Sequence, residues 1–344
     1  MTRRLLVFTL ALASVAPFAA VGAVAAGGAM QAPTGDRGWR TVAAGGRTCV
    51  EDQTGADRNC LPQNIGQITD LRETEQGWVA AGQLPAANGR DVVLFRSTSK
   101  DIERLASLPE ASVPRGRPRL ATDGTRLLGM VWLEGASQAE LEVRAAEWLG
   151  RDWGPVVTVS PVGPGSQVAP TVTVLDDGRW LLLWTAFDGQ DDETLWSLYD
   201  GGLWSAPAAV HENNTTPDIV PTVLATRRGA IAAWSWLDGR DYRLRTAFFD
   251  GSSWRLDPPT GGRGAVDARL IATAGSYLLT LQTVVPEEWV TYELDAEGRQ
   301  LRRAAIPNSS NERPTIHLEE SGISFRWLGG ELPRELLAPW ETAR

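Results

Sequence analysis

The fold is decided by residues 170–207, which read PTVTVLDDGRWLLLWTAFDGQDDETLWSLYDGGLWSAP. Short runs of apolar and β-branched residues alternate here with Asp-Gly and Gly-Gly pairs. Such runs, separated by such pairs, are typical of β-hairpins. Four of them in succession predict a four-stranded antiparallel meander.

The same pattern recurs about every fifty residues. Three sets of markers keep this spacing: Trp153, Trp204 and Trp254 (51 and 50 residues apart), Trp132, Trp184 and Trp236 (52 and 52), and Pro118, Pro170 and Pro221 (52 and 51). A four-stranded sheet repeated at this length is typical of a propeller blade, which buries its faces against neighbouring blades. The second strand of each unit is nearly all apolar, as expected for a strand that is covered on both sides.

Looser units extend the pattern upstream to residue 67 and downstream to residue 340. The last unit lacks a final strand, and we expect residues 35–43, GDRGWRTVA, to supply it and so close the ring. The sequence therefore predicts an all-β fold, a six-bladed β-propeller of four-stranded antiparallel blades within residues 27–344. Five or seven blades stay open as alternatives because the outer units are degenerate.

The turns LYDGGLW (198–204) and FFDGSSW (248–254) resemble the Asp-box, S-x-D-x-G-x-x-W, of sialidase-type β-propellers. Each has one residue fewer before the Trp. In that superfamily the box lies on the outer turn between the third and fourth strands, away from the ligand. The resemblance therefore implies structural roles for Asp200, Gly201, Trp204, Asp250, Gly251 and Trp254.

The same resemblance implies what a sialidase-type active site would need: three arginines for a substrate carboxylate, a tyrosine nucleophile assisted by a glutamate, and an aspartate as acid/base. Arg117, Arg269 and Arg313 stand near the starts of predicted innermost strands, and arginines around one axis can bind a carboxylate. However, the chain has no Arg-Ile-Pro motif. Its four tyrosines lie inside predicted strands, without the context of a nucleophile, which counts against retained glycosidase chemistry.

In a propeller, the loops from second to third strand and from blade to blade emerge on one face, which usually holds the ligand. The richest polar segments of the chain fall in such loops: FDGQDDE (187–193), LDGRD (237–241), HENNTTPD (211–218) and PNSSNER (307–313). The candidate ligand-binding residues here are Asp188, Asp191, Asp238, Arg240, His211 and Asp218.

These loops allow several interpretations. Oxygen atoms of Asp188, Asp191 and Asp238 could hold calcium or hydrogen-bond a sugar, although the spacing differs from the DxDxDG loop of a calcium site. Solvated acidic hairpin loops are the alternative. His211 is either an acid/base group or a loop residue that makes an ordinary hydrogen bond.

The N-terminus and the cysteines bear on localisation. Residues 1–26 predict a signal peptide, with arginines ahead of an apolar run and an Ala-Val-Ala cleavage signal at 23–25. An uncleaved anchor is the alternative, and no later segment is apolar enough for a second span. Cys49 and Cys60 predict a disulfide in a periplasmic or extracellular protein. Without a nearby histidine they cannot form a usual zinc site, so no metal centre is predicted.

Two functions from different classes remain. A net charge of -9 argues against nucleic acid as a partner. The repeat predicts the blades clearly, but the sequence has no identifiable set of catalytic residues. This combination favours an exported protein that binds a glycan, a protein or an envelope ligand. The Asp-box resemblance and the three arginines favour the alternative, a sialidase-type glycoside hydrolase with diverged motifs.

Overall fold

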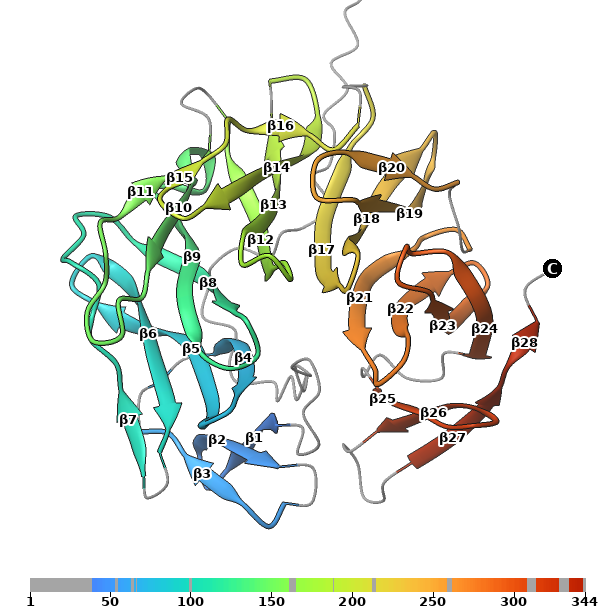
Figure 1. Ribbon diagram of the computed structural model, residues 1–344, viewed down its shortest axis with the longest axis horizontal. Helices are drawn as coiled ribbons and strands as arrows, with labels where there is room; N and C mark the ends of the chain where they lie inside the picture. The colour runs from blue at the N-terminus through green and yellow to red at the C-terminus, as the bar shows by residue number, and fades with distance from the viewer. Residues whose placement is uncertain are drawn as a thin grey trace, which may run out of the picture.

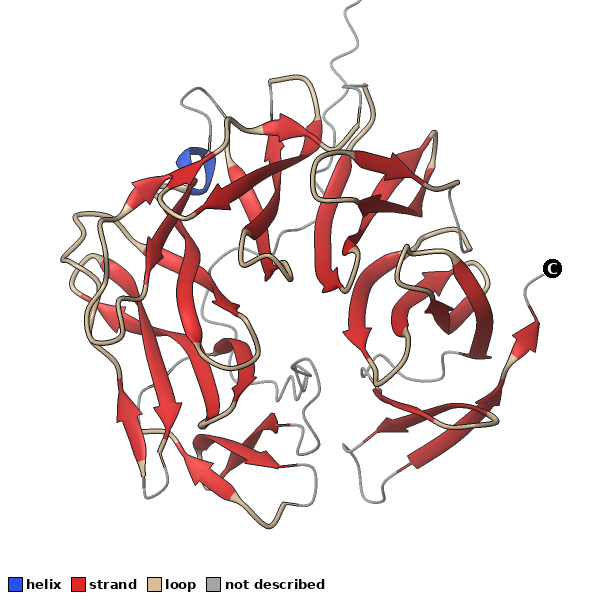
Figure 2. Cartoon of the chain, viewed as in Figure 1, coloured by secondary structure: helices blue, strands red, loops and turns tan. Residues whose placement is uncertain are grey.

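The protein is described here from a computed structural model that covers residues 39–342, except 53–54, 63–64, 66, 99–100, 161–164, 188, 212–214, 259–261, 308–313 and 328–333. Seven antiparallel β-sheets follow one another around a ring (Figure 1). The chain is therefore an all-β, seven-bladed propeller. Figure 2 shows the strands in red and one short helical turn, η1 (Gln138–Glu140). Within the described residues, no helix reaches the length and apolar content that crossing a membrane requires.

We number the blades in chain order and give their strands from the inside of the ring outward. Blade 1 holds β1 (Trp39–Ala44), β2 (Arg47–Asp52) and β3 (Arg58–Cys60). Blade 2 holds β4 (Ile68–Thr74), β5 (Gly77–Ala86), β6 (Gly89–Ser97) and β7 (Ile102–Arg104). Blade 3 holds β8 (Arg115–Thr122), β9 (Leu127–Glu134), β10 (Glu142–Glu147) and β11 (Val157–Thr158).

The remaining blades follow the same plan. Blade 4 holds β12 (Gln167–Val174), β13 (Trp180–Phe187), β14 (Asp192–Asp200), β15 (Leu203–Trp204) and β16 (Ala208–Ala209), the last two both paired with β14. Blade 5 holds β17 (Asp218–Thr226), β18 (Gly229–Asp238), β19 (Asp241–Phe249) and β20 (Trp254–Leu256). Blade 6 holds β21 (Val266–Ala272), β22 (Tyr277–Val284), β23 (Glu287–Leu294), β24 (Gln300–Pro307) and β28 (Glu341–Thr342). Blade 7 holds β25 (Thr315–Leu318), β26 (Gly322–Trp327) and β27 (Arg334–Pro339).

The predicted number of six blades is wrong, and seven, one of the two alternatives left open, is the number that the structure shows. The prediction assumed one spacing of about fifty residues for every unit, but blade 1 is much shorter. Its first strand begins at Trp39 and that of blade 2 at Ile68, only 29 residues later. Blade 1, with its three described strands, therefore fits into a segment for which the spacing of about fifty residues predicted only one strand, at residues 35–43.

The predicted closure of the ring is wrong as well. Strand β1, which contains the described part of the segment 35–43, pairs with β2 and starts blade 1. Blade 7 pairs as β25-β26-β27, and the chain then leaves it so that β28 joins the outer edge of blade 6. Among the described residues the first and last blades share no strand, and the charge of Arg40 in β1 helps to lower the pKa of His317 in β25.

Tryptophan rings fill the seams between blades, as the repeat predicts. Trp132, Trp184 and Trp234 are 0% exposed and stand opposite the bulge of the innermost strand in blades 3, 4 and 5. The equivalent ring in blade 5 is thus Trp234, not Trp236, although Trp236 keeps the spacing of 52. The Trp236 ring is only partly buried and lies under the guanidinium of Arg245, 3.9 Å away. Burial of one such ring stabilises the fold by roughly 2–3 kcal/mol.

Each of these bulges has the same backbone. Arg117, Ala169 and Val220 precede the periodic prolines and adopt left-handed conformations, with φ of 51°, 50° and 55°. Residues other than glycine seldom adopt this backbone conformation. The strand pairing on both sides of the bulge must therefore stabilise it. The bulge aims these three positions away from the regular pleat of the innermost strands.

Arg119 ties three blades together beside the first bulge. Its guanidinium donates to the carbonyl oxygens of Thr69 in β4 and Pro170 in β12. Burial lowers the pKa of Arg119, with the charge of Asp70 acting in the opposite direction. This side chain therefore acts as a clamp between the innermost strands of blades 2, 3 and 4.

Two further predictions can be compared with the structure. Cys49 and Cys60 form a disulfide between β2 and β3, which confirms that pairing. The turn at Asp250 is held by its own carboxylate, which accepts hydrogen bonds of 2.8 Å from the backbone of both Ser252 and Ser253. These bonds lower the pKa of Asp250 to about 2. Such a local network fits a role in closing the hairpin.

Candidate functional site

Each blade runs antiparallel from its innermost strand outward, so the propeller has two distinct faces. We call loop face the side where innermost strands begin, second strands end and third strands begin. In blades 4 and 5 this face carries residues 189–191, 210–211, 215–217 and 239–240, which lie between strands β13 and β14, β16 and β17, and β18 and β19. The opposite side, with the other hairpins, is the far face.

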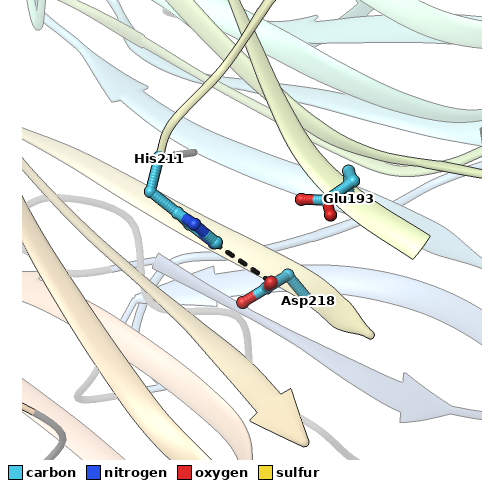
Figure 3. A group of neighbouring side chains, drawn as sticks. All are labelled: Glu193, His211 and Asp218. Carbon is cyan, nitrogen blue, oxygen red and sulfur yellow. Dashed lines mark hydrogen bonds and ion pairs between the residues drawn. The ribbon is translucent and has the colours of Figure 1, made fainter. Parts of the chain in front are cut away.

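A cluster of three ionisable side chains lies on the loop face at the seam between blades 4 and 5. Glu193 comes from the start of β14, His211 from the connection after β16, and Asp218 from the start of β17 (Figure 3). One donor atom from each lies within 4.8 Å of those of the other two. Among the described residues, no other three His, Cys, Asp or Glu side chains converge in this way.

Asp218 is the fixed centre of the cluster. It is 0% exposed, and its Oδ1 atom accepts a 2.6 Å hydrogen bond from Nε1 of Trp234. The same position in the repeat is Gln167 in blade 4, which binds Trp184 at 2.7 Å, and Arg115 in blade 3, which pairs with Glu134. Blade 5 thus uses a position common to the repeat to present a carboxylate.

His211 is oriented from two sides. Its Nε2 atom lies 3.0 Å from Oδ2 of Asp218, and its ring is nearly parallel to that of Trp234, with 9° between the planes and 6.0 Å between centroids. The side chain is only 6% exposed. Because a carboxylate can only accept, Nε2 carries the hydrogen of this bond, which fixes the neutral ring as its Nε2–H form.

Glu193 is buried on the blade 4 side of the seam, with 2% exposure. It stands opposite Ala186 in the β13–β14 ladder. More acid groups surround it: Asp191 is buried at 7% exposure, and the charge of Asp192 helps burial to raise the pKa of Tyr242 in β19. This part of the loop face is therefore strongly acidic.

This arrangement suits two kinds of chemistry. Two carboxylates and one imidazole are acceptors for hydroxyl donors and are common ligands of metal ions. The hydrogen-bonded imidazole and carboxylate also form a pair that can hold or pass a proton.

The structure brings some of the predicted residues together and separates others. His211 and Asp218 are in direct contact. Asp238 instead pairs with Arg243 at 2.8 Å at the end of β18, and Arg240 is exposed in the following turn. Asp188, the third member of the proposed calcium set, lies outside the described residues.

The three arginines of the proposed carboxylate site cannot be assembled from the described residues. Arg117 is exposed at the bulge of β8, in blade 3. Arg269 lies in β21, in blade 6, and burial lowers its pKa. Arg313 lies outside the described residues. The shared arginine site therefore stays a prediction.

Sequence reasoning left out one residue of the cluster, Glu193, and the tryptophan that orients the cluster, Trp234. Glu193 was only one of several acids in an acidic loop, and a strand-starting position was the signal that could have singled it out. Trp234 was passed over in favour of Trp236. The bulge before Pro221 could have identified it. The buried tryptophan is the residue that stands opposite the bulge, and its position does not follow the spacing of 52 residues.

A cleft of about 670 Å³ lies on the far face across blades 2, 3 and 4. Its lining includes Trp148, Glu147, Arg126, Asp123 and Tyr199. Burial, and then the Glu147 side chain, raises the pKa of Tyr199. This tyrosine and its glutamate are thus on the opposite side of the propeller from the acidic cluster.

No protein-family model matches the chain, and no curated protein matches its sequence. Solved structures do match. A protein of unknown function from Dyadobacter fermentans is similar, with a TM-score of 0.50 and 12% identity over 82% of this chain and 96% of that one. A polysaccharide lyase of family PL25, an ulvan lyase, is similar with a TM-score of 0.52 and 11% identity over 80% of this chain and 74% of that one.

The sialidase from Trypanosoma rangeli is also similar, with a TM-score of 0.49 and 11% identity, over 84% of this chain and 56% of that one. Similarity at this level carries no argument about activity, and the Asp-box identity of the turns stays a prediction. By its similarity to solved structures this chain is a β-propeller, a fold that it has in common with a peptidase and a polysaccharide lyase, whose activities are unrelated.

Proposed function

We propose that the protein is a glycan-binding propeller, which takes its ligand on the loop face at the seam between blades 4 and 5. The observation that carries this proposal is the buried convergence of Glu193, His211 and Asp218 at the surface where propellers usually hold ligands. The disulfide, together with the signal peptide that the sequence predicts, fits a protein that meets glycans outside the cytoplasm.

The charges of the site favour a neutral ligand that is rich in hydroxyl groups. Carboxylates accept hydrogen bonds, and sugar hydroxyls donate them. Asp191, Glu193 and Asp218 lie buried beneath this part of the loop face, and their negative charges would repel an anionic ligand there. Two arginines of blade 5 and of its connection to blade 6 are already paired with acids: Arg243 with Asp238 and Arg263 with Asp241.

A sialidase-type hydrolase remains the alternative, and two observations make it the weaker one. Tyr199, which hydrogen-bonds the Glu147 side chain, lies on the far face. The acidic cluster, by contrast, is poorly suited to the carboxylate of a sialic acid. The hydrolase would have to use Arg117 and Arg269, which belong to blades 3 and 6.

The test is a glycan array followed by titration of the bound glycans against purified protein. The same preparation is assayed for turnover of sialyl and other aryl glycosides. We expect binding of neutral glycans without turnover. Turnover that disappears in Arg117→Ala, with the fold intact, would overturn the proposal in favour of the hydrolase.

A further inference from the structure

We infer that Glu193, His211 and Asp218 form a binding site for a divalent transition-metal ion, with Zn²⁺ as the best match. This inference concerns the residues of the proposed glycan site but does not depend on glycan binding. It rests on the geometry of the donor atoms, on their burial and on the partners that orient them.

The donor atoms are close to the distances that a metal site needs. Two ligand atoms bound to one ion at about 2.0–2.2 Å lie about 3.3–3.6 Å apart in a tetrahedral site. Nε2 of His211 and Oδ2 of Asp218 are 3.0 Å apart. The widest separation in the cluster is within 4.8 Å, so a small rotation of the Glu193 side chain closes the third position.

Burial makes the cluster more favourable for a cation. The Glu193 and Asp218 side chains are 2% and 0% exposed. Two carboxylates held close together in a low-dielectric place repel each other, and a divalent ion between them turns that repulsion into attraction. An imidazole beside them adds a neutral ligand.

The surroundings of the cluster also resemble the outer shell of a metal site. The Trp234 indole holds Oδ1 of Asp218 at 2.6 Å, which leaves Oδ2 directed at His211. Hydrogen bonds of this kind orient a ligating carboxylate and strengthen metal binding. The parallel Trp234 ring limits rotation of the imidazole.

The donor types select the class of ion. Calcium and magnesium prefer sites made of oxygen atoms, whereas imidazole suits zinc and similar metals. The ion would replace the hydrogen between Nε2 and Oδ2, and the neutral ring would then carry its hydrogen on Nδ1. A protonated imidazole cannot bind the ion, so affinity falls at acid pH. Three protein ligands leave coordination positions open for water or for sugar hydroxyls.

The experiment uses purified protein without a polyhistidine tag, stripped with chelator and titrated calorimetrically with Zn²⁺, Mn²⁺ or Ca²⁺ in the absence of any glycan. Equilibrium dialysis with metal analysis gives the stoichiometry. The variants are His211→Ala and Glu193→Gln, with His317→Ala as the matched control that removes the other histidine of the chain. Glu193→Gln keeps the size of the side chain, so it carries the test if His211→Ala fails to fold.

We expect one Zn²⁺ per chain in the wild type and in His317→Ala, with weaker binding of Ca²⁺. Affinity should fall at least tenfold in His211→Ala and Glu193→Gln, and about tenfold in Trp234→Phe, which removes the hydrogen bond to Asp218. Absence of Zn²⁺ binding in the wild type would overturn the inference, as would equal binding in a folded Glu193→Gln. Because no glycan is present, either failure leaves the proposed glycan function untouched.

Discussion

Nε2 of His211 and Oδ2 of Asp218 lie 3.0 Å apart at the seam between blades 4 and 5. The two residues belong to the connection between these blades and to the first position of β17. The repeat fixes the second of these positions, since Trp234 binds Asp218 as Trp184 binds Gln167. Asp218 therefore occupies a position that the repeat uses to bind the buried tryptophan, and it also presents a carboxylate oxygen to His211.

The two tryptophans of β18 should differ in their effect on stability. Trp234→Phe loses a hydrogen bond to a buried carboxylate and leaves a cavity, so we expect it to lower the free energy of unfolding by about 2–4 kcal/mol. Trp236 is partly exposed, and Trp236→Phe should cost about 1 kcal/mol. Urea titration of both variants measures the difference. Equal losses would contradict the assignment of Trp234 as the buried ring of this seam.

The Arg119 clamp depends on the fork geometry of the guanidinium. Arg119→Lys keeps a positive charge but cannot reach the carbonyls of Thr69 and Pro170 at once. We expect a loss of about 1–3 kcal/mol, because a buried carbonyl loses its donor. Thermal unfolding measures this loss. A melting temperature unchanged from that of the wild type would show that the clamp contributes nothing.

The disulfide should stabilise blade 1, in which the structure describes three strands. Cys49 and Cys60 are 11 residues apart, and a loop of this length corresponds to about 2–3 kcal/mol in the chain-entropy account. The double variant Cys49→Ser/Cys60→Ser should therefore unfold at lower urea concentration than the oxidised wild type. The reduced wild type should behave like the variant. A variant as stable as the oxidised protein would be the contrary result.

The stability of blade 7 should depend on pH through His317. Burial lowers the pKa of His317 from 6.5, assisted by Arg326 and Arg40 and opposed by Glu335 and Glu319. The unfolded chain thus takes up the proton near pH 6.5 while the folded chain resists it. This contribution to stability is present above pH 6.5 and is lost as pH falls below it. Stability measured from pH 7.5 to 5 should fall less steeply in His317→Ala, and equal slopes would contradict this explanation.

The sequence predicted the blades far better than their number. Strand periodicity and turn residues are local, so blades 3 to 5 were correctly divided into strands, and Cys49 and Cys60 were correctly paired. The number of blades depends on how the ends of the chain meet, which the spacing of the central units does not encode. Blade 1 is short, and the strand at Trp39 starts a sheet of its own.

The candidate site was predicted only in part for a related reason. His211 and Asp218 were selected as polar residues in loops on one face. Their contact depends on the bulge at Val220 and on the indole of Trp234, which are three-dimensional features. Glu193 joins them from another blade, and no sequence spacing links β14 to β17.

The most direct test of the central claim compares the two faces in one binding experiment. A glycan that the array identifies is titrated against the wild type, against Glu193→Gln and Asp218→Asn on the loop face, and against Asp123→Asn in the far-face cleft. If the acidic cluster is the site, affinity falls at least tenfold in both loop-face variants and is unchanged in Asp123→Asn. Binding that survives in folded Glu193→Gln and Asp218→Asn but is lost in Asp123→Asn would place the ligand in the far-face cleft and contradict the account.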